Sequence, residues 1–114
     1  MASIELSLFV HWEKTLRDIL SRTEKFPKRV RFTLSSRIDN LALDVLEKIV
    51  EARYAKDKSA ALSQASLSLE KLRVMIRISH EERHLDFRGF EHVARNVDEA
   101  GRMLGGWMRS RSVK

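Results

Sequence analysis

Residues 26–54, FPKRVRFTLSSRIDNLALDVLEKIVEARY, decide the fold class of this chain. Their apolar residues recur at the three-to-four-residue spacing that turns one side of an α-helix toward a core. This stripe consists of Leu34, Ile38, Leu41, Val45, Ile49 and Ala52. The residue before a proline is pushed out of the helical conformation, so Phe26 marks a break ahead of Pro27. A helix is therefore predicted from Pro27, as its first residue, to about Tyr54.

Three further segments show the same period. Helices are predicted from about Ile4 to Lys25, from a polar turn at residues 56–59 to about Glu82, and onward from Asp86, a suitable N-cap. Their apolar stripes are Phe9, Trp12, Leu16, Ile19 and Thr23; Leu62, Ala65, Leu69, Leu72 and Ile76; and Phe90, Val93, Val97, Gly101, Leu104 and Met108. Short connections make consecutive helices antiparallel neighbours. The prediction is an all-α, up-down-up-down four-helix bundle, with residues 1–114 as one domain.

Composition supports this fold class and narrows the function. The chain has 114 residues, of which 43% are hydrophobic, and its four glycines and one proline offer few turns for a strand-rich fold. It contains no cysteine, which excludes a disulfide framework and thiolate chemistry. No apolar run approaches the roughly 20 residues of a membrane span, and the first residues do not resemble a secretory signal. A cytoplasmic protein with no membrane partner is expected.

The charge balance favours a polyanionic partner. The chain has 22 Lys and Arg against 16 Asp and Glu, a formal net charge of +6. Cations that meet phosphates release counterions and thereby gain affinity, so RNA or DNA is the predicted partner. A basic surface without a nucleic-acid role is the alternative.

Two of the predicted helices carry a second apolar stripe opposite the first. These second stripes consist of Leu43, Leu46 and Val50 on the second helix and of Leu67, Val74 and Ile78 on the third. A monomeric bundle has no use for such stripes, because they would leave apolar surface in water. A homo-oligomer with these six residues at its interface is predicted, while scattered exposed aliphatic residues are the alternative.

Three groups of basic residues are candidate binding sites. Arg88, Arg95, Arg102 and Arg109 recur every seven residues on the last helix and would span roughly 30 Å. Such a row could follow a nucleic-acid backbone, or it could form an ordinary charged face by pairing with Glu91, Asp98 and Glu99. The other groups are Arg73 with Arg77 on the third helix, and Lys25, Lys28, Arg29 and Arg31 around the first connection.

Residues 80–84, HEERH, match the H-E-x-x-H pattern of zinc proteases. In that pattern two histidines one helical turn apart bind the metal, and a third ligand completes the site. Here the pattern lies at a predicted helix end, and no third ligand has the required spacing, although His92 or Glu99 could be invoked. No nucleophile with a base and no glycine-rich phosphate loop is present either. The sequence predicts a non-catalytic protein without a metal, cofactor or small-molecule substrate.

Three stretches in order resemble one protein family. They are residues 26–32, FPKRVRF; residues 69–77, LEKLRVMIR; and residues 101–107, GRMLGGW. Together they are similar to the accessory variability determinant proteins of diversity-generating retroelements, over nearly the whole chain. The bundle proteins encoded by intervening sequences of bacterial large-subunit ribosomal RNA are more distant, since they lack the Leu-Gly-Gly-Trp ending.

The resemblance implies a basic homopentameric barrel of four-helix bundles that binds the retroelement's reverse transcriptase and nucleic acid. Such a protein supports mutagenic copying of template RNA into cDNA, and retrohoming, without being the polymerase. Residues that match the family pattern and carry charge are Lys28, Arg31, Arg73, Arg77 and Arg102, and we place partner contacts first at Arg73 and Arg77. Trp107 and the glycines are expected to be structural, with Gly101 and Gly105 admitting a neighbouring helix. The alternative function is that of an intervening-sequence type of RNA-associated bundle without a polymerase partner.

Overall fold

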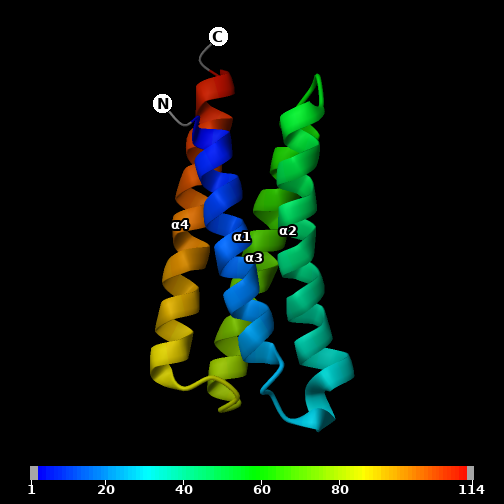
Figure 1. Cartoon of the computed structure of the whole chain (residues 1–114), viewed down its shortest axis with the longest axis vertical. Coiled ribbons are helices and arrows are strands. Elements are labelled where there is room, and N and C mark those ends of the chain that lie inside the picture. The colour runs from blue at the N-terminus through cyan, green and yellow to red at the C-terminus, as the bar shows by residue number, and fades with distance from the viewer. Residues whose placement is uncertain (1–2, 113–114) are drawn as a thin grey trace.

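A computed structural model describes residues 3–112, with the side chain of Ser112 excepted, and all regular structure in this range is helical. The four long helices are α1 (Ile4–Thr23), α2 (Ser36–Tyr54), α3 (Ser59–Glu81) and α4 (Phe87–Ser112). Two short helices, η1 (Lys28–Val30) and η2 (Arg31–Ser35), join α1 to α2. Each long helix runs opposite to the one before it, in a bundle 48 Å long (Figure 1). The predicted antiparallel four-helix bundle is confirmed.

The predicted apolar stripes form the core of the bundle. Every member of the third stripe is buried, and so are all members of the second except the half-buried Leu34. In the first stripe Phe9 is half-buried, and α1 also buries Leu8. In the same way, α4 buries Ala100 and Trp107 in addition to its stripe, so Trp107 has the structural role expected of it. Apolar burial of this kind is the main favourable term in folding, and it explains why the spacing of these residues predicted the helices.

The first connection differs from the prediction. Pro27 has a ψ of 144°, which is not helical, so it precedes the 3₁₀ turn η1 and is not the first residue of an α-helix. The five residues of η2 form a π-helical turn, and regular α-helix begins at Ser36. The predicted start at Pro27 is therefore nine residues too early, because eight residues of irregular helix come before the regular α-helix. A π-helical turn is rare and is frequently found at functional sites.

The connection between α3 and α4 follows its prediction closely. The Asp86 carboxylate accepts a hydrogen bond from the Gly89 backbone N–H at 2.7 Å, as an N-cap does at the third helical residue. Arg83 has a φ of 67°, the left-handed conformation that commonly ends a helix, and it turns the chain away from α3. This connection and the η1–η2 segment lie at the same end of the molecule (Figure 1). We call this end, with residues 24–35 and 82–88, the two-loop end.

The glycines of α4 do not have the role expected of them. A Cβ atom at Gly101 would meet no atom nearer than Arg73 Nη2, at 3.8 Å, and one at Gly105 would meet Arg109 of the same helix. The expectation that these two glycines admit a neighbouring helix is therefore wrong within one chain. Close approaches to α1 occur instead at Gly106, where a Cβ would lie 2.9 Å from Ile4 Cδ1, and at Gly89, where it would lie 2.8 Å from Arg22 Nη1.

Replacement of Gly101 with alanine is expected to raise the free energy of unfolding by about 0.5–1 kcal/mol, because alanine loses less backbone entropy in a helix and fits the available space. Urea unfolding followed by circular dichroism measures the change. Gly106→Ala is the control: the same gain in helix propensity is opposed by the contact with Ile4, so its net effect should be smaller. A loss of stability in Gly101→Ala would mean that this surface is covered by something outside the chain.

Within residues 3–112, none of the helices combines the length and apolar character needed to cross a membrane.

Candidate partner-binding surfaces

The second apolar stripes of α2 and α3 are largely exposed. Leu43 and Val50 of α2 keep 38% of their surface in contact with solvent, while Leu67 and Val74 of α3 keep 56% and 41%. Leu46 and Ile78 are half-buried, and Leu46 packs against the core. Four of the six residues predicted for an oligomer interface are therefore available on the surface of one chain.

The N-terminal half of α1 carries exposed apolar residues that the sequence analysis did not identify. Ile4, Leu6 and Val10 are 39%, 41% and 55% exposed. They lie off the core stripe of α1, and the spacing of Leu6 and Val10 by four residues was the available signal. They extend the apolar surface of the molecule to a third helix.

Arg73 and Arg77 lie at the rim of a groove between α3 and α4. The groove has a volume of about 330 Å³, and it is lined by Val74, Ile76, Phe90, Ala94 and Val97 in addition to Arg73, Arg77 and Asp98. Charged residues around an apolar floor are typical of a site for a protein side chain or helix, since the floor gives affinity and the rim gives orientation. The structure thus brings the two residues ranked first by sequence into one site.

Both arginines of this groove are already paired. Arg73 donates to Asp98 of α4 at 2.8 Å and also to Glu70, and Arg77 donates to Glu81 at 3.0 Å. Glu81 follows Arg77 by one helical turn, so this pair could have been predicted from the sequence. A bare phosphate would have to compete with these carboxylates, so the groove suits a partner protein better than a nucleic acid.

The arginine row of α4 is partly an ordinary charged face. Arg95 pairs with Glu91 at 3.6 Å and Arg102 with Glu99 at 2.5 Å. The hydrogen bond and the charge of Arg102 lower the pKa of the Glu99 carboxyl. Arg88, at the start of the row, and Arg109, near its end, make no ion pair with any residue of 3–112. The row is therefore two paired arginines between two unpaired ones.

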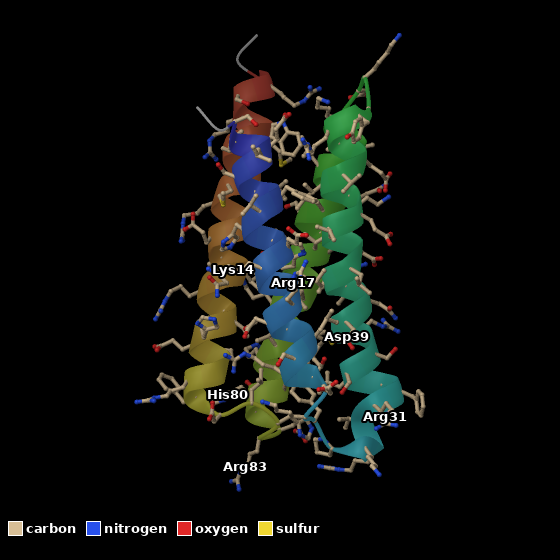
Figure 2. All side chains as sticks on the ribbon, viewed as in Figure 1. Lys14, Arg17, Arg31, Asp39, His80 and Arg83 are labelled. Atoms are coloured by element: carbon tan, nitrogen blue, oxygen red, sulfur yellow. The ribbon has the colours of Figure 1, made fainter. Side chains whose placement is uncertain are left out.

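Unpaired cations gather at the two-loop end. Side chains there that make no ion pair within the described part of the chain are Lys25, Lys28, Arg29, Arg31, Arg83 and Arg88. Figure 2 shows Arg31 and Arg83 at this end, on different connections. Sequence analysis identified the four residues of the first connection and Arg88, but it could not place Arg83 beside them. These six cations outnumber the Glu24, Glu82 and Asp86 carboxylates of the same segments, and the resulting net positive charge attracts a polyanion.

Two exposed aromatic residues lie at the same end. Phe32 in η2 is 87% exposed, and Phe87 at the first position of α4 is 62% exposed. Neither was identified from the sequence as a functional residue, although neither falls on a core stripe. Exposed aromatic rings among unpaired cations are a known feature of surfaces that bind single-stranded nucleic acid.

The two-loop end also contains a cavity of about 290 Å³, which lies between α1 and α2 and is largely polar. Its lining includes Asp39, Ser35 and Arg31. The Thr23 hydroxyl donates to Asp39 at 2.6 Å, while the buried Ser35 hydroxyl has no hydrogen-bond partner among residues 3–112. Burial raises the pKa of the Asp39 carboxyl, and the hydrogen bond from Thr23 partly opposes that shift. The cavity shows that η2 is packed imperfectly against α1.

The H-E-x-x-H pattern does not form a histidine pair. α3 ends at Glu81, so His84 lies in the connection, as expected from the position of the pattern. The His80 ring stacks on Phe90 at 4.6 Å, and its Nδ1 lies 3.0 Å from the Leu85 carbonyl oxygen. The His84 ring faces Phe26 instead, at 5.4 Å. No group of three or more His, Cys, Asp or Glu side chains within residues 3–112 is placed to hold a metal ion.

These features define a class of protein: a basic, antiparallel four-helix bundle with an apolar groove between α3 and α4 and unpaired cations at one end. The family model described as bAvd-like matches residues 9–111. The chain belongs to the bAvd-like family, which confirms the resemblance to accessory variability determinant proteins. A comparison with curated proteins gives no significant match.

Proposed function

We propose that this chain is a non-catalytic accessory protein of a diversity-generating retroelement. It binds the retroelement reverse transcriptase and nucleic acid in the cytoplasm, and so supports mutagenic copying of template RNA and retrohoming. The observation that carries this proposal is membership of the bAvd-like family over residues 9–111. The unpaired cations at the two-loop end are consistent with a nucleic-acid partner.

The two kinds of surface suit two kinds of partner. The groove of Arg73 and Arg77 has an apolar floor and paired charges, which favours a protein segment such as one from the polymerase. The two-loop end carries unpaired charge and little apolar surface apart from two phenylalanines, which favours phosphates. In this proposal the polymerase occupies the groove and the nucleic acid occupies the two-loop end.

The exposed second stripes supply the surface for self-association. Leu43, Val50, Leu67 and Val74 would be covered in a homo-oligomer, and a pentamer is what the family resemblance implies. Light scattering coupled to size exclusion gives the mass directly. A mass of five protomers supports this assembly, whereas a monomer at micromolar concentration contradicts it.

Replacement of both Arg73 and Arg77 with alanine is expected to weaken binding of the cognate reverse transcriptase at least tenfold. The substitutions remove the rim of the groove and leave the Asp98 and Glu81 carboxylates without partners. A pull-down with purified polymerase at moderate salt measures the effect, with circular dichroism and light scattering to verify folding and assembly.

Arg17→Ala with Arg95→Ala is the matched control, since it also removes two paired arginines and neither of them lines the groove. Normal polymerase binding by the Arg73/Arg77 variant would refute the assignment of this groove. Failure of the wild-type chain to bind the polymerase, with RNA still bound, would favour an RNA-associated bundle of the intervening-sequence type.

A further inference from the structure

A groove at the start of α2 has the size and chemistry to hold a single nucleotide. Its volume is about 510 Å³, and its lining residues are Phe32, Thr33, Leu34, Ser36, Arg37, Asn40 and Met75. η2 and the first turn of α2 form one wall, and Met75 of α3 contributes the other. Leu34 and Met75 pack against the core, so they give the groove a firm apolar part of its lining.

Phe32 is the aromatic wall of this groove and the most exposed large apolar side chain of the described residues, at 87%. It lies in η2, the π-helical turn that precedes α2, and off the core stripe that runs from Leu34 along α2. An aromatic ring left in water gains by stacking on another flat apolar surface, and the face of a nucleobase is such a surface.

The polar residues of the groove are free to bind. Arg37 makes no ion pair within residues 3–112, and the exposed Asn40 side-chain amide makes no hydrogen bond there. An amide offers a donor and an acceptor side by side, as the edge of a base requires, and a guanidinium suits a phosphate. Three more unpaired cations of the two-loop end precede Phe32 closely in the chain: Lys28, Arg29 and Arg31.

We propose that this groove binds an unpaired nucleotide of a single-stranded RNA or DNA, with the base stacked on Phe32. Asn40 lies where it can contact the base edge, and Arg37 with the neighbouring cations holds the flanking phosphates. Inside a duplex, neighbouring base pairs stack on both faces of a base and its partner occupies the Watson–Crick edge, so a duplex cannot use Phe32 in this way. This inference rests on the nucleic-acid part of the proposed function and adds a preference for single strands.

The test measures the affinity of labelled oligonucleotides of about 12 nucleotides, a length within known site sizes, by fluorescence anisotropy. A single-stranded RNA, a single-stranded DNA and a duplex of equal phosphate number are compared at one salt concentration. Phe32→Ala is expected to lower single-strand affinity about tenfold and to change duplex affinity less than about twofold, since stacking of one base has that magnitude. Phe32→Trp should restore the loss. If Phe32→Ala lowers the affinity for single-stranded RNA and DNA equally, Phe32 stacks on the base and the groove does not recognise the 2′-hydroxyl.

Tyr54→Ala is the matched control, because Tyr54 is 82% exposed and lies at the opposite end of α2. Equal single-strand affinity of the wild type and Phe32→Ala would overturn the inference and leave the proposed function intact. A wild type that binds no nucleic acid would overturn both. The Phe32→Ala variant could instead form a smaller oligomer, or bind the polymerase more weakly while binding oligonucleotides normally. Either result would assign Phe32 to a protein contact and would also overturn the inference.

Discussion

Replacing Lys28, Arg29 and Arg31 with glutamine is expected to flatten the salt dependence of nucleic-acid binding. These three cations of the two-loop end are exposed and make no ion pair with residues 3–112. Each phosphate contact contributes about 0.7 to the slope of log affinity against log salt for single strands and about 0.9 for duplexes, so the slope should fall by roughly 2 to 3. Between about 50 and 200 mM salt, the wild type should therefore lose roughly 20- to 40-fold more affinity than the variant.

The matched control removes three cations that are already paired. Arg17 binds Glu13 at 3.4 Å, Arg95 binds Glu91 at 3.6 Å and Arg102 binds Glu99 at 2.5 Å. Their triple replacement with glutamine lowers the net charge by the same amount as the first variant, yet we expect the slope to fall by less than about 1. Anisotropy titrations at four or five salt concentrations measure both slopes. Equal slopes for the two variants would show that binding depends on the net charge of the protein and not on the cations of the two-loop end.

Replacing Trp12 with alanine is expected to lower the free energy of unfolding by about 3–5 kcal/mol. Trp12 is fully buried in α1, and its indole Nε1–H donates to the Ala42 carbonyl oxygen of α2 at 2.9 Å. The substitution removes the largest fully buried side chain and leaves a cavity between two helices. Because domains of this kind are stable by about 5–15 kcal/mol, the variant should be close to unfolding at physiological temperature.

Urea unfolding at several protein concentrations measures the effect, since an oligomer gains stability with concentration. Trp12→Phe keeps most of the apolar volume but loses the hydrogen bond, so its loss should be smaller. Val10→Ala is the control on the same helix: Val10 is 55% exposed, and its replacement should change the free energy by less than about 0.5 kcal/mol. A change below about 1 kcal/mol in Trp12→Ala would contradict the burial of this residue in solution.

The helices could be predicted from local sequence patterns, because the residues that bury one face of a helix recur every three to four positions. Ile38, Val45 and Ile49 each lie one or two turns apart, and all are buried against the other helices. Asp86 as an N-cap was predictable for the same reason, since a cap involves residues three positions apart. The start of α2 was not predictable in this way, because Pro27 fits both the first position of an α-helix and the position before a 3₁₀ turn.

The candidate sites were predicted in part. The basic residues were identified by type, but their availability depends on which acids face them. Asp98 was one of the acids that could have paired with the arginines of α4, and it pairs instead with Arg73 of α3 at 2.8 Å, a contact between residues 25 positions apart. Sequence analysis could not place Arg83 at the two-loop end, because only the fold brings the connection between α3 and α4 to the same end as the first connection (Figure 2). The exposure of Phe32 agrees with its place off the core stripe, but the π-helical turn that contains it leaves no pattern in the sequence.

The amino-acid sequence by itself determined the number, type and order of the helices, the positive charge and the family, because these properties depend on spacing and composition along the chain. The tertiary structure decided which cations remain unpaired, which apolar residues stay exposed and where a groove opens. Those properties depend on distances between residues of different helices, and such distances are set by the packing of the whole bundle and not by any local period.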